Sequence, residues 1–193
     1  QASDSSQIDL NISSTGEGPL KWTLGYYTFS EDALYRFIWG STSQASPQSV
    51  AWASWLHGSQ TTNDSSAFYG QAEYDITDSA TLTLGARQSD DERTSQSLQP
   101  DGPSNADLPG YTTTTAPQQV GDDSQFDYRL ALQYDITDDI MLFGSLSTGY
   151  ISGAVQETTG NLLDASENKA VEIGLKGTFL DGAMLLNATY YDS

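Results

Sequence analysis

Few side chains of this sequence are able to do chemistry. His57 is the single histidine among 193 residues, cysteine is absent, and Trp52 and Trp55 precede the histidine closely. A zinc site needs three or four ligands at suitable spacing, and no second ligand is spaced to join His57. We therefore predict no metal site and interpret His57 as an exposed loop residue.

Adjacent carboxylates occur twice, at Asp90-Asp91 and at Asp122-Asp123. Such pairs suggest hydrolysis or calcium binding, but a calcium loop needs alternating oxygen ligands around a glycine turn, and that pattern is missing. The Gly-x-Ser-x-Gly elbow of many hydrolases is also missing. We predict no catalytic residue, no enzyme activity and no cofactor, and we interpret the pairs as acidic surface loops.

Aromatic residues are the remaining candidates for contact with a small molecule. Large rings offer flat apolar surface that stacks on a ligand ring or sugar, and they pack a loop against its neighbours equally well. We slightly favour packing for the cluster that begins near Tyr35. The substrate-contact candidates are Trp39, Trp52, Trp55 and Tyr111.

The charge balance is strongly acidic, with 7 Lys and Arg against 26 Asp and Glu and a net charge of -19. Phosphate backbones bind basic surfaces, so this balance argues against a nucleic-acid partner. Most of the acid lies in segments that we expect to be loops. Acidic loops favour cationic or neutral ligands, or divalent cations that bridge lipopolysaccharide.

The elements that must position these residues are β-strands. Along 126–136, one set of alternate positions reads Phe, Tyr, Leu, Leu, Tyr and Ile, whereas the other reads Asp, Arg, Ala, Gln and Asp. A strand sorts such residues onto two faces, and a helix would scatter them. In the 140–150 segment both faces carry apolar residues, so its facing stays open. We predict eight strands near 7–13, 20–29, 66–76, 80–89, 125–136, 140–150, 169–179 and 183–192.

The strand lengths and connections favour a membrane barrel. Most strands have about 9–11 residues, the length that crosses a bilayer at a tilt. The connections alternate between short turns, two of which share Tyr-Asp-Ile-Thr-Asp at 74–78 and 134–138, and long polar segments. Short turns on one rim and long loops on the other are typical of outer-membrane barrels. The extracellular loops are predicted near 30–64, 90–124 and 151–168.

Charged residues on the polar faces of these strands should point into the barrel. They either pair with one another or with a plug, or they line a passage for polar solutes. The lumen-facing candidates are Lys21, Arg87, Arg129, Lys176, Asp127 and Glu172.

Several segments together resemble the barrel of TonB-dependent receptors. They are Phe126-Asp127-Tyr128-Arg129-Leu130 with Leu142-Phe143-Gly144, then Val171-Glu172-Ile173-Gly174-Leu175-Lys176-Gly177, with an earlier hairpin of Tyr69-Gly70-Gln71 and Leu82-Thr83-Leu84-Gly85. The resemblance implies an all-β antiparallel up-and-down meander, open or artificially closed when alone, from a barrel of about 22 strands. Residues 1–193 would be a partial barrel, since neither the N-terminal plug nor a terminal aromatic residue is found.

The resemblance also implies a function. A bacterial outer-membrane receptor would take up a ferric siderophore, cobalamin or a glycan, energised by the TonB complex through the plug that is absent here. Its other partners would be outer-membrane lipid and lipopolysaccharide. The alternatives are a complete small eight-stranded barrel and a soluble β-sandwich binding module.

Overall fold

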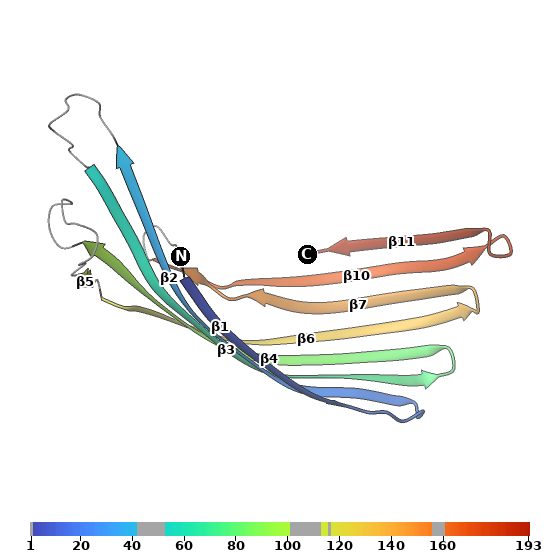
Figure 1. The fold of residues 1–193 in the computed structure, drawn as a ribbon. Helices are drawn as coiled ribbons and strands as arrows, with labels where there is room; N and C mark the ends of the chain where they lie inside the picture. Colours follow the sequence, from blue (N-terminus) through green and yellow to red (C-terminus); the bar gives the residue numbers. More distant parts are fainter. Residues whose placement is uncertain (1, 42–52, 101–112, 116, 156–160) are drawn as a thin grey trace.

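The computed structural model describes residues 2–41, 53–100, 113–115, 117–155 and 161–193. Eight long strands form one antiparallel sheet in which each strand pairs with the next along the chain (Figure 1). Their bounds are β1 (Ala2–Ser13), β2 (Leu20–Ser41), β3 (Ala53–Thr77), β4 (Ala80–Pro100), β6 (Gln119–Thr137), β7 (Ile140–Ile151), β10 (Ser166–Phe179) and β11 (Met184–Asp192). The predicted all-β meander of eight strands is confirmed.

Three short strands complete the described structure. β5 (Thr113–Thr115) pairs with the end of β4, so the sheet has nine strands in all. β8 (Ala154–Val155) and β9 (Leu162–Leu163) pair only with each other, as a small separate hairpin. No helix in the described ranges is long and apolar enough to span a membrane.

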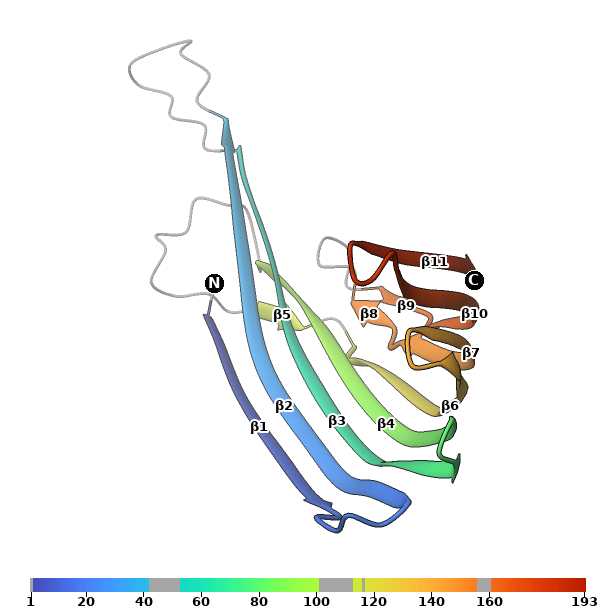
Figure 2. The same ribbon diagram turned by 90° about the vertical axis from the view of Figure 1, so that its right-hand side faces the viewer.

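The sheet is open and curved. Figure 2 shows the strands following one another around an arc, with β1 and β11 at its two ends and the β8–β9 hairpin inside the curve. In the described part of the chain, the pairing order ends at β1 on one side and at β11 on the other. The second sheet in the described residues is the β8–β9 hairpin, which has only two residues in each strand and is too small to cover the large sheet, so the arrangement is a section of barrel wall and not a sandwich.

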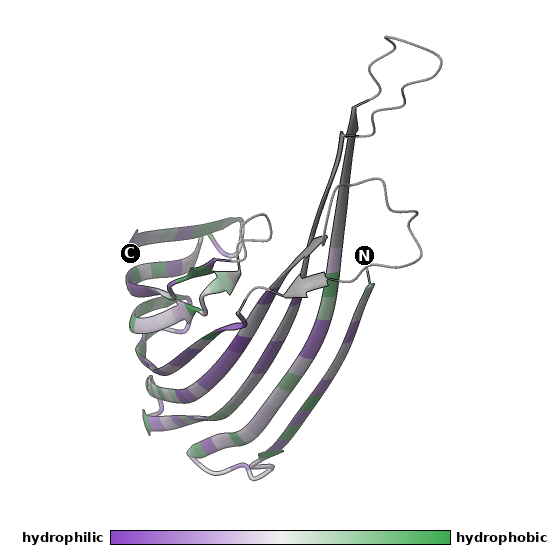
Figure 3. Ribbon diagram, turned by 90° about the vertical axis from the view of Figure 1, so that its left-hand side faces the viewer, coloured by the Kyte–Doolittle hydropathy of each residue, from purple (hydrophilic) through white to green (hydrophobic). Residues whose placement is uncertain are grey.

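One face of the sheet is apolar across all of its long strands. Directly opposite residues in neighbouring strands share a face, and one row of the register joins Trp22, Ala72, Leu84, Leu130 and Leu146. Large apolar side chains on this face are widely exposed, and hydrophobic and hydrophilic bands alternate along the strands (Figure 3). We call this face the apolar belt; exposed apolar surface of this extent indicates contact with lipid.

The opposite face is polar and lies on the inside of the arc. Its rows contain the small residues that are most buried, among them Ala67, Ser89 and Ser95. The β8–β9 hairpin lies over the same face, because Leu162 of β9 reaches Gly121 of β6. We call it the concave face.

Four strands run well beyond their predicted ends, which corrects the predicted loops near 30–64 and 90–124. β2 and β3 remain paired from Leu20 and Tyr74 as far as Ser41 and Ala53, and β4 pairs with β6 as far as Ser95 and Gln119. The outer segments of β3, β4 and β6 are rich in Ser, Thr, Asp and Gln, whereas that of β2 carries apolar residues at odd and even positions alike. Neither of their faces needs to meet lipid, so the apolar alternation that reveals a strand is missing although the backbone pairing continues. His57 consequently lies in β3 and not in a loop.

The third predicted loop, near 151–168, is also partly strand. It holds the β8–β9 hairpin, and β10 already begins at Ser166. This hairpin has only two residues in each strand, too few for a period of two to be visible in the sequence.

The two Tyr-Asp-Ile-Thr-Asp segments form the same turn. In each, the strand register shifts at the isoleucine, between Asp75 and Thr77 and between Asp135 and Thr137. The threonine hydroxyl then accepts a hydrogen bond from the backbone N–H two residues on, at 3.2 Å in both turns. The repeat therefore encodes a local turn with a bulge.

The register also settles the facing of β7. Leu142 and Leu146 are directly opposite Tyr134 and Leu130, and so belong to the apolar belt. Phe143 lies on the concave face, where its ring covers Gly174 of the neighbouring strand.

Candidate functional site

The register places the predicted charged residues on one face. Opposition across neighbouring strands assigns them all to the concave face, and Arg87 is directly opposite Asp127. Their assignment to the lumen of a closed barrel stays a prediction. The six residues are Lys21, Arg87, Arg129, Lys176, Asp127 and Glu172.

Two of these cations rest on aromatic rings. The Tyr69 ring lies over Gly25, where a Cβ would come within 2.1 Å of it, and the Arg87 guanidinium is 6.0 Å from its centroid and 5.4 Å from that of Tyr27. Phe143 covers Gly174 in the same way, and the Lys176 ammonium lies 5.2 Å from its centroid. A cation over a ring is held in place without losing its charge.

The carboxylates beside these cations are engaged with neutral donors. Asp127 accepts a hydrogen bond from the Thr148 hydroxyl at 2.9 Å, and Asp9 accepts one from Tyr69 at 2.8 Å. Within the described ranges, no carboxylate lies within 4 Å of the Arg87 or Lys176 charge. The middle of the concave face therefore presents cations that remain available to other molecules.

One ion pair lies further along the same face, beyond the level of the apolar belt. Arg93 of β4 crosses over Gly121 and donates to an Asp123 carboxylate oxygen of β6 at 2.5 Å. The same oxygen accepts the backbone N–H of Gly153 at 3.2 Å. Arg93 is 7% exposed and Asp123 is 23% exposed as side chains. We call this arrangement the hairpin clasp, because it holds Gly153, the residue before β8, against Asp123 of the large sheet.

Sequence reasoning missed the hairpin clasp. Arg93 follows three acidic residues, and we placed it in an acidic surface loop. The two glycines, Gly121 and Gly153, are the signal that was available, because each gives a side chain room to cross close to backbone. They lie 28 and 60 residues from Arg93, so only the fold relates them to it.

The adjacent carboxylate pairs are split by the strands. Asp90 and Asp122 point to the outer face, which is the face that carries the apolar belt further along the strands. Asp91 and Asp123 belong to the concave face. Neither pair can therefore act as two cooperating carboxylates on one bond.

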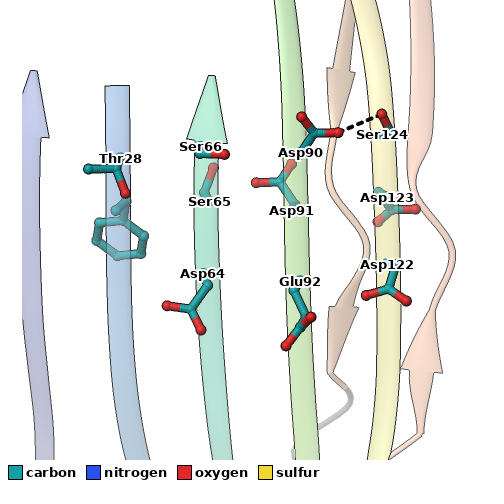
Figure 4. Close-up of a pocket in the computed structure, with 11 residues that line it drawn as sticks. Thr28, Asp64, Ser65, Ser66, Asp90, Asp91, Glu92, Asp122, Asp123 and Ser124 are labelled. Atoms are coloured by element: carbon teal, nitrogen blue, oxygen red, sulfur yellow. Dashed lines mark hydrogen bonds between the residues drawn. The ribbon is translucent and has the colours of Figure 1, made fainter. Parts of the chain in front are cut away.

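A groove on the outer side holds a row of carboxylates. Asp64, Glu92 and Asp122 are directly opposite one another on β3, β4 and β6, and the Ser124 hydroxyl donates to Asp90 at 2.7 Å (Figure 4). Like charges directly opposite each other destabilise a sheet. In the described residues no group of three or more His, Asp or Glu side chains is arranged to hold a metal ion.

The aromatic candidates are only partly covered by the structure. Trp39 and Trp55 are directly opposite each other in the register of β2 and β3. Trp52 and Tyr111 lie outside the described residues. A role of these residues in substrate contact stays a prediction.

Comparison with known families accounts for this geometry. The model of the family described as TonB dependent receptor-like, beta-barrel, matches residues 1–193, the whole chain. The chain belongs to this family. TonB-dependent receptors reside in the bacterial outer membrane and are transporters, not enzymes, so the apolar belt is the lipid-facing side of a barrel wall.

Solved receptors show the same fold over almost the whole chain. The ferric yersiniabactin uptake receptor FyuA from Yersinia pestis matches 98% of the chain with a TM-score of 0.72 and 18% identity. The ferric-catecholate import receptor Fiu from E. coli K12, in its closed form, matches 98% with a TM-score of 0.71 and 14% identity. The chain spans 28% and 31% of these two receptors. No curated protein matches the chain.

Glycine at position 153 should be necessary for docking of the receptor's hairpin. A Cβ there would lie 2.1 Å from the Leu163 carbonyl oxygen and 2.6 Å from an Arg93 nitrogen, and a backbone carbonyl cannot move aside cheaply. We expect Gly153→Ala to destabilise the docked hairpin by about 1–3 kcal/mol through overpacking. Amide hydrogen exchange in β8 and β9 should accelerate accordingly.

Gly149→Ala is the matched control, because nothing lies within 4 Å of a Cβ at that position. Equal acceleration in both variants would contradict the steric role of Gly153.

The hairpin clasp should also respond to acid. The hydrogen bond from Arg93, supported by the Gly153 N–H, holds the pKa of Asp123 below its ordinary value of 3.8. A depressed folded-state pKa means that the stabilisation is present above the ordinary value and is lost as pH falls through the lowered pKa. We expect the ratio of pepsin cleavage near Leu162 to cleavage at other sites to rise as the pH falls through the lowered pKa of Asp123.

Asp123→Asn provides the control for this titration. Its side chain does not ionise, so cleavage at the hairpin relative to other sites should no longer change with pH. A wild-type ratio that stays constant through the acid range would show that Asp123 does not control docking.

Proposed function

We propose that this chain forms part of the wall of an outer-membrane receptor that imports a ferric siderophore with energy from the TonB complex. The observation that carries the proposal is the concave face, which presents Arg87 and Lys176 on aromatic rings without a carboxylate partner within the described ranges. Fixed cations on the inner side of a barrel attract anionic solutes. Ferric complexes of catecholate ligands carry negative charge.

The similar solved receptors support this substrate class over the two others. FyuA is a ferric yersiniabactin receptor and Fiu is a ferric-catecholate receptor, whereas cobalamin and glycans are the alternatives. The open sheet and the 28–31% share of these receptors favour a section of a large barrel over a closed barrel of eight strands.

The orientation and the partners follow from the same proposal. The Tyr-Asp-Ile-Thr-Asp turns lie on the periplasmic rim, and the long ends of β2, β3 and β4 project outside the cell. The TonB complex acts through a plug domain outside residues 1–193. Lipid and lipopolysaccharide contact the apolar belt, and the acidic outer groove lies above it.

Uptake of radioactive iron tests the proposed function. Cells that lack the receptor carrying this chain, grown under iron limitation, should lose uptake of one anionic ferric siderophore and regain it with the intact gene. Arg87→Gln should lower uptake at subsaturating siderophore severalfold, since each lost charge contact is worth about 1 kcal/mol or more. Unchanged iron uptake together with lost cobalamin or glycan uptake would overturn the proposed substrate.

A further inference from the structure

The apolar belt contains a furrow. It has a volume of about 660 Å³, and its floor consists of the small residues Gly70, Ala72 and Ala86 on β3 and β4. Trp22 and Leu24 of β2 form one wall, and Leu84 of β4 with Phe126 of β6 forms the other. On the neighbouring part of the belt, Leu130 of β6 lies directly opposite Leu146 of β7, so two large side chains meet there.

Glycine at position 70 controls the shape of this furrow. A Cβ there would lie 2.7 Å from a Leu24 methyl group, so its absence lets Leu24 lie down against β3. At the outer end, the Tyr26 and Phe68 rings pack with centroids 4.7 Å apart and close the apolar section. The furrow is therefore a shallow, open depression that large side chains border on both sides.

The two ends of the furrow differ in polarity. Beyond Phe68 and Phe126, the next outward-facing row carries Ser66, Asp90 and Ser124. The carboxylate row of Asp64, Glu92 and Asp122 follows it along the same strands. A molecule that fills the furrow must thus have a long apolar group between Trp22 and Phe68, and its polar part must begin at the row of Ser66, Asp90 and Ser124.

We propose that the furrow binds one acyl chain of an outer-membrane lipid, held between Trp22 and Leu84 with its head group toward Ser66 and Asp90. The family resides in the outer membrane, and the furrow is continuous with the lipid-facing belt, so hydrocarbon chains are the molecules that reach it. Inside the membrane, an acyl chain gains no hydrophobic free energy when it moves from the surrounding lipid onto the protein. Preference comes from packing, because a chain seated among side chains of four strands makes dispersion contacts that a flat surface lacks.

The site is independent of the transported substrate. It lies on the side of the sheet opposite the concave face, and none of its walls belongs to the hairpin clasp. Failure of the siderophore proposal would leave it intact, and its own failure would not affect the siderophore proposal.

Quenching of Trp22 fluorescence by brominated acyl chains tests the site. The full receptor that carries this chain is reconstituted with Trp22 as its sole tryptophan, in bilayers with increasing fractions of a dibrominated phosphatidylcholine. A seated chain contacts Trp22 directly. We expect half-maximal quenching at a brominated fraction at least about twofold lower than in an Ala86→Leu receptor, whose furrow floor is filled.

Ala188→Leu is the matched control, since it adds the same side chain to the apolar belt on β11, away from the furrow. Its quenching curve should coincide with that of the unfilled receptor. Identical curves for the unfilled and the Ala86→Leu receptors would overturn the proposal. Complete resistance of Trp22 to quenching would also overturn it, because a second copy of the chain or another protein would then cover the furrow.

Discussion

Asp123→Ala is expected to release the β8–β9 hairpin from the barrel wall. The substitution takes from Arg93, which is 7% exposed, its ion-pair partner among the described residues. The Arg93 Nε and Nη1 atoms are already buried, and neither has a hydrogen-bond partner in the described part of the chain. Removing one member of a buried ion pair typically costs about 3–5 kcal/mol, because the other charge is left uncompensated.

Hydrogen exchange in β8 and β9 of the full receptor measures this loss as a change in the free energy of local opening. Asp122→Ala is the matched control, since the neighbouring carboxylate points to the outer face. A change at exposed surface of this kind usually stays within about 0.5 kcal/mol. Equal effects of the two substitutions would argue that the hairpin clasp does not hold the hairpin.

Leu130→Arg is expected to reduce insertion of the barrel strongly. Leu130 lies in the middle of β6 on the apolar belt, between Leu84 and Leu146, and is 43% exposed toward lipid. An arginine on the lipid face at the bilayer midplane costs about 2–4 kcal/mol. The folded fraction in a urea titration of the receptor with lipid vesicles should show a loss of this size.

Gln133→Arg separates the effect of lipid from that of charge. Gln133 is exposed on the concave face of the same strand, and its amide reaches toward Asp135 at 3.5 Å. We expect only a small change in folding there. A loss at Gln133 as large as that at Leu130 would mean that the two faces are assigned wrongly.

The sequence was sufficient for the wall of the barrel. Alternate apolar residues in 126–136 and in the other strands predicted the eight strands and the apolar belt, because lipid on one side imposes a period of two. The same reasoning failed beyond the belt. Residues 30–41 of β2 continue the strand with no change in pairing, but apolar residues stand at odd and even positions alike, so no period of two is visible there.

Contacts between distant segments were also beyond reach. Arg93 and Asp123 are 30 residues apart, and Gly153 is 30 residues further along the chain. The furrow depends on which small residues of β3 and β4 become neighbours, and that is decided by strand register. Register is fixed by the bulged turns, whose shift by one residue cannot be read from composition.

The unbroken pairing of β2 with β3 has a consequence for how the receptor meets its surroundings. Twelve residues of β2 beyond Phe29 extend about 40 Å along the strand at ~3.3 Å per residue. In the proposed orientation, this two-stranded ribbon of β2 and β3 projects beyond the lipid head groups. A molecule diffusing toward the cell would therefore touch its tip among the outer sugar chains before it met the membrane.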